Sequence, residues 1–233
     1  MQLNRKEVVQ QLIDSKGYEN YLEIGVFLGH VFFDINAKNK IAVDPNKKYS
    51  WFKLFKRSLK YNFSNLRARS IKLTSDDFFA REAAAIYAKN PIDICLVDGM
   101  PEYGFALRDV ENTLKYLQKG GVSVMHDCNP QSEASNASYE DWEKSGFAGM
   151  WNGDVWKTIV HLRSLRDDIN VFVLDCDQGL GIVSFGKPES KLNFNQEEIK
   201  ALSYQQLEQN RKEWLNLKEP GYFYEYFNLP RKS

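Results

Sequence analysis

The sequence predicts an α/β protein in which a doubly wound, mostly parallel sheet of seven strands ends in an antiparallel hairpin. Short apolar runs bounded by glycine, proline, aspartate or asparagine alternate with amphipathic stretches. That alternation is typical of parallel strands joined by crossover helices. The last two runs are joined only by residues 175–181. This connection is too short for a helical crossover and therefore favours a hairpin.

The expected elements follow from local patterns taken in chain order. The strands are Tyr21–Ile24, Ile41–Val43, Ser70–Leu73, Ile92–Val97, Val122–Met125, Val171–Leu174 and Ile182–Phe185. Apolar residues at helical spacing predict helices over Tyr103–Leu117 and Asp154–Leu165, and a polar helix is expected over Gln196–Leu217. A further helix is expected to open at Gly29.

Composition limits the class of protein. The chain of 233 residues fits one α/β domain with additions, and 31 basic against 31 acidic side chains argue against a general nucleic-acid binder. Three cysteines without a CxxC pair exclude the usual zinc and redox motifs and suit a reducing compartment. No apolar signal core and no apolar stretch of about 18 residues are present. We therefore expect a cytoplasmic protein without a membrane span.

Two segments lie outside the repeating pattern. Residues 45–75 combine nine basic side chains with interleaved aromatics and no acid. They are interpreted as a solvated helix with an aromatic inner face or as a patch for an anionic partner. Residues 1–190 are expected to form the cofactor domain, and residues 191–233 a helical, aromatic-rich extension. The extension is expected to pack on the domain or to form a homodimer contact.

The turn after the first strand has the features of a cofactor site. Gly25 permits a sharp turn and a close approach of the backbone to a ligand, and Gly29 would place helix amides above the sheet. Glu23 supplies a carboxylate suited to an ammonium group. Asp44 ends the second strand at the distance typical of an acid that binds the ribose hydroxyls of an adenosine.

Other residues refine the kind of cofactor. Ser75 and Asp76 follow the third strand and are candidates to bind an adenine amino group. Phe27 stands where the second glycine of G-x-G-x-x-G belongs. This substitution disfavours a pyrophosphate, and so disfavours a nicotinamide-dependent reductase. The structural alternative is a tight strand-to-helix turn that binds nothing.

Two carboxylates predict a cation site. Asp98 ends the fourth strand and Asp127 ends the fifth, and neighbouring parallel strands bring their carboxyl ends together. Two carboxylates with a third donor suit a hard cation, which would lower the pKa of an acceptor hydroxyl. The alternative is that Asp98 caps a turn and Asp127 binds loop backbone.

The chain resembles class I S-adenosylmethionine-dependent methyltransferases over residues 20–186. It is most similar to a metal-dependent branch that acts on sugars and small hydroxylated molecules. The resemblance rests on Leu-Glu-Ile-Gly-Val, Val-Asp-Pro, and a block from Val97-Asp98-Gly-Met-Pro-Glu-Tyr103 through Gly120-Gly121 to His126-Asp127. It implies a Rossmann-like methyltransferase fold, S-adenosylmethionine as cofactor, and a small-molecule or glycan acceptor.

The resemblance also implies roles for individual residues. Glu23, Gly25, Gly29, Asp44, Ser75, Asp76 and Asp98 would bind the cofactor, and Asp98, Asp127 and His126 would bind Mg²⁺ or Mn²⁺. Pro101 stands where relatives often carry a histidine base, which leaves His126, Asp127 and Tyr103 as the catalytic candidates. The long loop of residues 128–153 would face the acceptor and close over it with its aromatics. A non-catalytic cofactor-binding protein remains the alternative.

Overall fold

The computed structural model describes residues 3–50 and 62–231. The chain forms two compact units. The N-terminal unit comprises Asn4–Met100 and Arg108–Val124. The C-terminal unit comprises Met1–Leu3, Pro101–Leu107 and Met125–Ser233.

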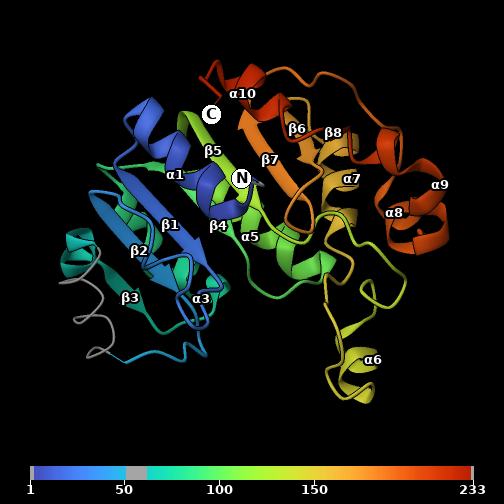
Figure 1. Ribbon diagram of the computed structural model, residues 1–233, viewed down its shortest axis with the longest axis horizontal. Helices are drawn as coiled ribbons and strands as arrows, with labels where there is room; N and C mark the ends of the chain where they lie inside the picture. Colours follow the sequence, from blue (N-terminus) through green and yellow to red (C-terminus); the bar gives the residue numbers. More distant parts are fainter. Residues whose placement is uncertain (1–2, 51–61, 232–233) are drawn as a thin grey trace. The chain divides into compact units, whose positions relative to one another are not determined.

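The N-terminal unit is built on parallel strands (Figure 1). Its strand order is β3-β2-β1-β4-β5. β1 pairs in parallel with both β2 and β4, and β2 pairs in parallel with β3. All six residues of β4 are buried, as expected for a strand covered on both faces. The bounds are β1 Asn20–Ile24, β2 Asn39–Val43, β3 Arg69–Ile71, β4 Ile92–Val97 and β5 Leu117–Met125.

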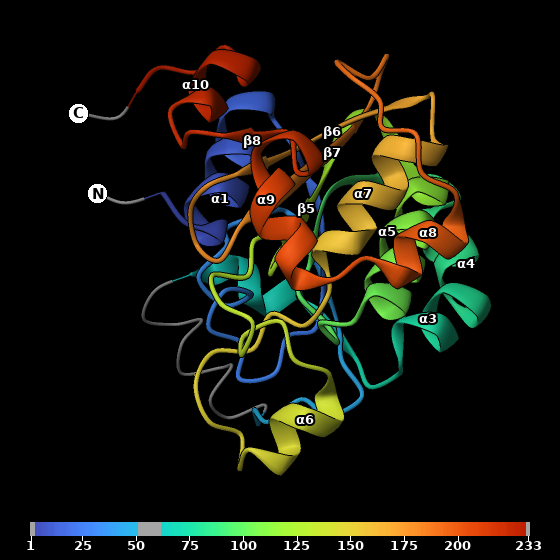
Figure 2. The same ribbon diagram turned by 90° about the vertical axis from the view of Figure 1, so that its right-hand side faces the viewer.

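Helices cover both faces of these strands. Figure 2 shows α1 on one side and α3, α4 and α5 on the other. α1 begins at a capping box formed by Asn4 and Glu7, and buries Val8, Val9 and Leu12. The doubly wound arrangement predicted for this part is confirmed. The bounds are α1 Arg5–Lys16, the 3₁₀ helix η1 Phe63–Arg67, α3 Ser75–Arg81, α4 Ala83–Tyr87 and α5 Tyr103–Tyr116.

The C-terminal unit contains the predicted hairpin. β6 (Ile169–Leu174) pairs antiparallel with β7 (Leu180–Phe185). The short strand β8 (Leu217–Lys218) pairs in parallel with β6, and the sequence analysis did not expect it. The other elements here are α6 Tyr139–Lys144 and α7 Trp156–Leu165.

The polar helix expected over Gln196–Leu217 is wrong in one respect, because the chain forms two helices there. α8 spans Gln196–Ala201 and α9 spans Tyr204–Trp214. Leu202 between them is extended, and Ser203 begins α9 with a capping box to Gln206. That local bonding competes with a continuous helix.

The C-terminal extension packs on the C-terminal unit. Trp214 of α9 stacks on Trp156, with ring centroids 6.2 Å apart. The buried Arg163 guanidinium donates to the Trp214 carbonyl at 2.9 Å and also to the Glu213 carbonyl. Tyr222 and Tyr226 of α10 (Tyr222–Phe227) contact Phe172 edge-on. A homodimer contact through this extension stays a prediction.

Part of the basic, aromatic stretch 45–75 lies outside the described residues, and so does most of the helix expected there. In the described part, the Lys47 Nζ and the Tyr49 hydroxyl each lie 2.7 Å from the Ser70 hydroxyl. Within residues 3–50 and 62–231, no helix combines the length and apolar character that crossing a membrane requires.

Candidate active site

The turn after β1 depends on glycine at residue 25. Gly25 has φ +82°, and a Cβ there would lie 2.0 Å from the backbone oxygen of Asp98. Only glycine tolerates this contact. The close approach expected at Gly25 therefore exists, but it is made to the end of β4 within the protein. Gly25 fixes the distance between the ends of β1 and β4.

Phe27 adopts a left-handed backbone conformation. Its φ is +43°, in the left-handed region that non-glycine residues rarely occupy. The Phe27 amide donates to Asp44 Oδ2 at 2.6 Å, and its carbonyl accepts the Lys48 amide at 2.8 Å. These two bonds hold the strained residue in place, while its side chain is 57% exposed.

The helix expected to open at Gly29 is wrong, because irregular turns follow this residue. Three carbonyls of the segment are bound by side chains instead of helix amides. The Lys40 ammonium donates to the carbonyls of Phe32 and Ile35 and to Asn65 Oδ1, at 2.5 to 2.6 Å. Asn62 and Asn65 donate to the Phe33 carbonyl. The regular helix is thereby replaced, and Gly29 itself packs against the Phe33 ring.

Asp44 binds the turn through both of its carboxylate oxygens. Oδ2 accepts the Phe27 amide and Oδ1 accepts the Asn46 amide, each at 2.6 Å. The residue is 7% exposed. Because each carboxylate oxygen has two acceptor positions, one position on each oxygen remains after these bonds. The arrangement suits a pair of vicinal hydroxyls approaching from the remaining side.

Glu23 lies inside the N-terminal unit rather than at an open strand end. It is 2% exposed, and the Tyr21 hydroxyl donates to its carboxyl group. Burial raises the pKa of Glu23 to about 8, opposed by the Tyr21 hydrogen bond and by the nearby Lys40 and Arg5 cations. Burial likewise lowers the pKa of Lys40 to about 7. Any ammonium group at Glu23 would have to reach an almost closed carboxyl.

Ser75 and Asp76 begin α3 and are bonded to α5. The Ser75 hydroxyl hydrogen-bonds the buried Asp109, whose pKa burial raises to about 6. Asp76 accepts the Arg108 Nε at 3.1 Å and remains half-exposed. Both residues therefore connect α3 to α5. An adenine amino group that binds them would share them with Arg108 and Asp109.

Asp98 directly follows β4, and its amide donates to the Ile24 carbonyl at 2.9 Å. Its Oδ2 lies 3.6 Å from Arg5 Nη1, and the side chain is 21% exposed. Arg5 lies at the start of α1, and the sequence analysis did not single it out. The guanidinium balances part of the charge that Asp98 would offer to a cation.

In the C-terminal unit, His126 lies between two carboxylates. Its Nδ1 is 2.9 Å from Asp127 Oδ1, and its Nε2 is 3.6 Å from Asp177 Oδ1. Asn152 Nδ2 donates to Asp127 Oδ1 at 2.7 Å. We call these four residues the His126 cluster. His126 and Asp127 were predicted from the sequence, whereas Asp177 and Asn152 were missed.

The hairpin connection that carries Asp177 is strained. Asp177, Gln178 and Gly179 have φ values of +46°, +63° and +86° in succession. The carbonyls of Gln178 and Gly179 accept the amides of Asn129 and Cys128. The backbone of Asp127 is also in the left-handed conformation, with φ +61°. Because strained backbone of this kind is often found at functional sites, the geometry adds weight to the cluster.

Tyr103 is bonded away from the His126 cluster. Its hydroxyl lies 2.7 Å from His161 Nδ1, and both side chains are buried. His161, the partner of this hydroxyl, lies on α7. Asp154, where a helix was expected to begin, accepts the Tyr103 amide at 2.7 Å, while α7 has no side-chain cap.

Pro101 occupies the position where a base was expected from relatives. A Cβ on Gly153, which has φ +53°, would lie 1.6 Å from the Pro101 carbonyl oxygen. The backbone of the long loop therefore packs directly on Pro101. This position offers no proton acceptor on a side chain, and the base has to be sought elsewhere.

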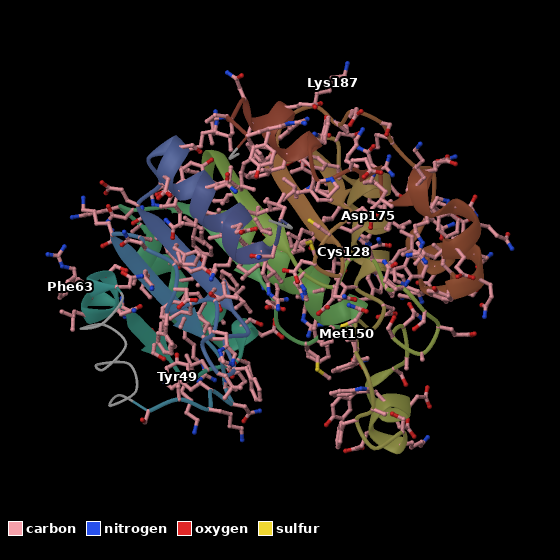
Figure 3. The ribbon with its side chains drawn as sticks, in the orientation of Figure 1. Tyr49, Phe63, Cys128, Met150, Asp175 and Lys187 are labelled. Carbon is pink, nitrogen blue, oxygen red and sulfur yellow. The ribbon has the colours of Figure 1, made fainter. Side chains whose placement is uncertain are left out.

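The loop of residues 128–153 contains an ordered aromatic cluster. Trp142 stacks on Trp151 with ring centroids 4.5 Å apart, and it meets Phe147 edge-on. α6 projects from the rest of the C-terminal unit (Figure 1). Met150, labelled in Figure 3, is 62% exposed. The aromatics expected to cover an acceptor thus stack on one another, and their function stays a prediction.

Comparison with known proteins agrees with this geometry. Residues 22–128 match a family described as a methyltransferase domain. The structure resembles an O-methyltransferase from Bacillus cereus in complex with SAH, with TM-score 0.54 and 14% identity over 79% of this chain and 82% of that chain. It also resembles the SAH-bound methyltransferase PaMTH1 from Podospora anserina, with TM-score 0.53 and 16% identity over 78% of each chain.

These likenesses settle the fold and the resemblance. The chain has the Rossmann-like α/β methyltransferase fold, with mostly parallel strands and an antiparallel hairpin near the end. The resemblance to class I S-adenosylmethionine-dependent methyltransferases that the sequence predicted is confirmed. No curated protein matches the chain significantly.

Proposed function

We propose that this protein is an S-adenosylmethionine-dependent methyltransferase that methylates an oxygen of a small molecule or glycan. The observation that carries the proposal is the buried Asp44 carboxylate, which keeps acceptor positions while it holds the Phe27 turn. An acid at the end of β2 beside such a turn suits the ribose of an adenosine. The SAH complex of the Bacillus cereus relative supports the same ligand class.

The residues present fit the cofactor in the N-terminal unit. Asp44 would accept the ribose hydroxyls, and the backbone from Gly25 to Gly29 would line the adjacent portion. We also propose cofactor contacts for four residues that already have a partner within the protein, and the cofactor would share them with that partner. These residues are Glu23, Ser75, Asp76 and Asp98. When bound, S-adenosylmethionine supplies a methyl group on a sulfonium. The protein's main contribution is orientation, and holding reactants together supplies about 7–11 kcal/mol.

We propose His126 as the base that takes the acceptor's proton. Its two ring nitrogens face Asp127 and Asp177, so the ring is held in orientation and its protonated form would be stabilised by both carboxylates. Tyr103 is less suited, because its hydroxyl is buried and bonded to His161. A positioned base typically contributes about two to four powers of ten in rate.

We propose metal assistance as the alternative to a free His126 base. Asp98, His126 and Asp127 offer the donor types of a divalent-cation site. One imidazole with carboxylates suits Mn²⁺ as well as Mg²⁺. The ion would supply Lewis-acid stabilisation of the acceptor oxygen. If His126 binds the ion, the ring nitrogen that binds it is not available to accept the proton of the acceptor.

Pro101 supports a second candidate function, a cofactor-binding protein without turnover. The loop backbone at Gly153 closes on this position, where relatives often carry the base. Transfer of labelled methyl groups to a panel of sugar and phenolic acceptors separates the two functions. Turnover supports the enzyme, whereas SAH binding with no product on any acceptor favours the non-catalytic protein.

The same assay tests His126 and the metal. We expect His126→Gln to lower kcat at least about a hundredfold, and His30→Gln to leave it unchanged. His30 is an exposed histidine of the N-terminal unit and serves as the matched control. Activity restored by Mn²⁺ or Mg²⁺ after treatment with EDTA supports the metal, and full activity in EDTA contradicts it.

A further inference from the structure

A cavity lies at the opposite end of the strands that lead to Gly25 and Asp44. It has a volume of about 190 Å³. Its lining includes Asn20 and Asn39, which begin β1 and β2, and Arg69, which begins β3. The predicted cofactor turn follows the carboxyl ends of β1 and β2. A five-residue strand of about 15 Å therefore separates the two places, and this cavity is distinct from the cofactor site.

The lining of this cavity is cationic. Arg67 and Arg69 contribute two guanidinium groups, and none of its ten lining residues is acidic. Arg69 lies 3.9 Å from the carboxylate of Glu82, and both side chains are exposed. Lys40 also lines the cavity, but its ammonium binds the carbonyls of Phe32 and Ile35. Two planar guanidinium groups suit an oxyanion with several acceptor oxygens.

Tyr87 supplies the second observation. Tyr87 is 8% exposed, and its hydroxyl has no hydrogen-bond partner among the described residues. The ring is fixed by Phe78 and Tyr116, with centroids 6.3 and 5.9 Å away. Burial raises the pKa of Tyr87, and the nearby Arg69 acts in the opposite direction. Buried hydroxyls are nearly always paired in proteins, so this donor points to an acceptor supplied from outside.

We propose that this cavity is a binding site for a small phosphate group. Arg67 and Arg69 would hold its charge, and the Tyr87 hydroxyl would donate to one of its oxygens. One water needs about 10–15 Å³ of such space, so about 190 Å³ accommodates a phosphate together with a short substituent. The proposal is independent of methyl transfer, because it rests on residues at the amino ends of the strands.

Calorimetric titration of the full chain with inorganic phosphate, against sodium chloride at equal ionic strength, tests the site. We expect saturable binding of phosphate with one site per chain. Glycerol 3-phosphate is the second titrant: tighter binding than phosphate identifies a monoester as the ligand, and equal binding identifies the free ion. Acetate that binds as tightly as phosphate, or phosphate that fails to bind, overturns the proposal.

Two variants locate the binding. Arg69→Leu should weaken phosphate binding at least about tenfold, since a charge-assisted contact is lost. Tyr87→Phe should weaken it about fivefold. Because Phe removes an unpaired buried hydroxyl, Tyr87→Phe should not lower the Tm measured without phosphate. Arg81→Leu, an exposed arginine paired with Asp77 on α3, is the matched control. Unchanged phosphate affinity in Tyr87→Phe and Arg69→Leu would overturn the assignment.

Discussion

The Asp44 carboxylate accepts the Phe27 backbone amide at 2.6 Å. This bond joins the end of β2 to the turn that follows β1. It also holds Phe27 in a left-handed conformation, with φ +43°. The residue proposed to bind the ribose is thus the residue that shapes the surrounding backbone. Structure and ligand binding therefore depend on the same carboxylate.

Asp44→Ala should reduce both stability and cofactor affinity. The substitution removes two hydrogen bonds from backbone amides to a charged acceptor. We expect the free energy of unfolding to fall by about 3 kcal/mol. Urea denaturation measures the loss of stability, and SAH titration at a temperature where the variant is folded measures affinity. Asp34→Ala, at an exposed partner of Lys6, should change neither, and an equal effect in that control would contradict the assignment.

Phe27→Gly should stabilise the fold. A non-glycine residue in the left-handed region destabilises the fold by about 1–3 kcal/mol. Replacing it with glycine removes this strain, but the greater freedom of glycine in the unfolded chain offsets part of the gain. We expect a net gain of about 1 kcal/mol in the free energy of unfolding. Phe27→Val should lower it instead, because a β-branched side chain is disfavoured at φ +43°. Equal stabilities for these two variants would show that Phe27 carries no strain.

Lys40→Met should destabilise the N-terminal unit severely. Lys40 is 1% exposed, and its ammonium donates to two backbone carbonyls and to Asn65. Methionine keeps the length of the side chain but leaves those acceptors unpaired, which we expect to cost about 3–5 kcal/mol. Lys38→Met is the control two residues away, where an exposed pair with Glu19 contributes about 0–1 kcal/mol. Comparable urea midpoints for the two variants would refute the role of Lys40.

Glu23→Gln should change how stability depends on pH. Because the pKa of Glu23 is raised from 4.5 to about 8, the folded protein binds an extra proton between these values. The free energy of unfolding should therefore fall as pH rises from about 4.5 to 8, by at most about 1.4 kcal/mol per unit. Glu23→Gln should flatten this slope, whereas the exposed control Glu19→Gln should preserve it. A parallel pH profile for wild type and Glu23→Gln would contradict a raised pKa.

The strands were predictable because each is a short apolar run with clear boundaries. Ile92–Val97 was predicted with the bounds that β4 has. The hairpin followed from the connection of only seven residues between the two predicted strands. β8 escaped prediction because two residues carry no periodic signal. The capping box at Ser203 was visible in the sequence and would have divided the helix expected over Gln196–Leu217, whereas the capping box at Asn195 marks the start of that helix.

The helix expected after Gly29 failed for a reason that only tertiary structure reveals. Lys40, Asn62 and Asn65 take the carbonyls that helix amides would bind. Nothing in the local pattern of residues 29–37 indicates that a lysine on β2 is buried beside them. A single lysine in a strand is more commonly expected at the surface.

The site was predicted best where it follows directly from strand order. His126 and Asp127 come straight after β5, and the structure pairs them at 2.9 Å. Asp177 was missed because it lies 50 residues further on, in a turn between two hairpin strands. The bond between Asp154 and the Tyr103 amide could not be predicted, because the two residues are 51 positions apart in the sequence.

Calorimetric titration of the purified chain with SAH tests the central claim most directly. We expect saturable binding at one site, with a Kd in the micromolar range in wild type and a large loss of affinity in Asp44→Ala. The folded state of Asp44→Ala is checked by circular dichroism at the titration temperature. Absence of binding heat for wild type at every temperature tested, with the protein folded, would contradict the proposal that the turn after β1 and Asp44 form a cofactor site.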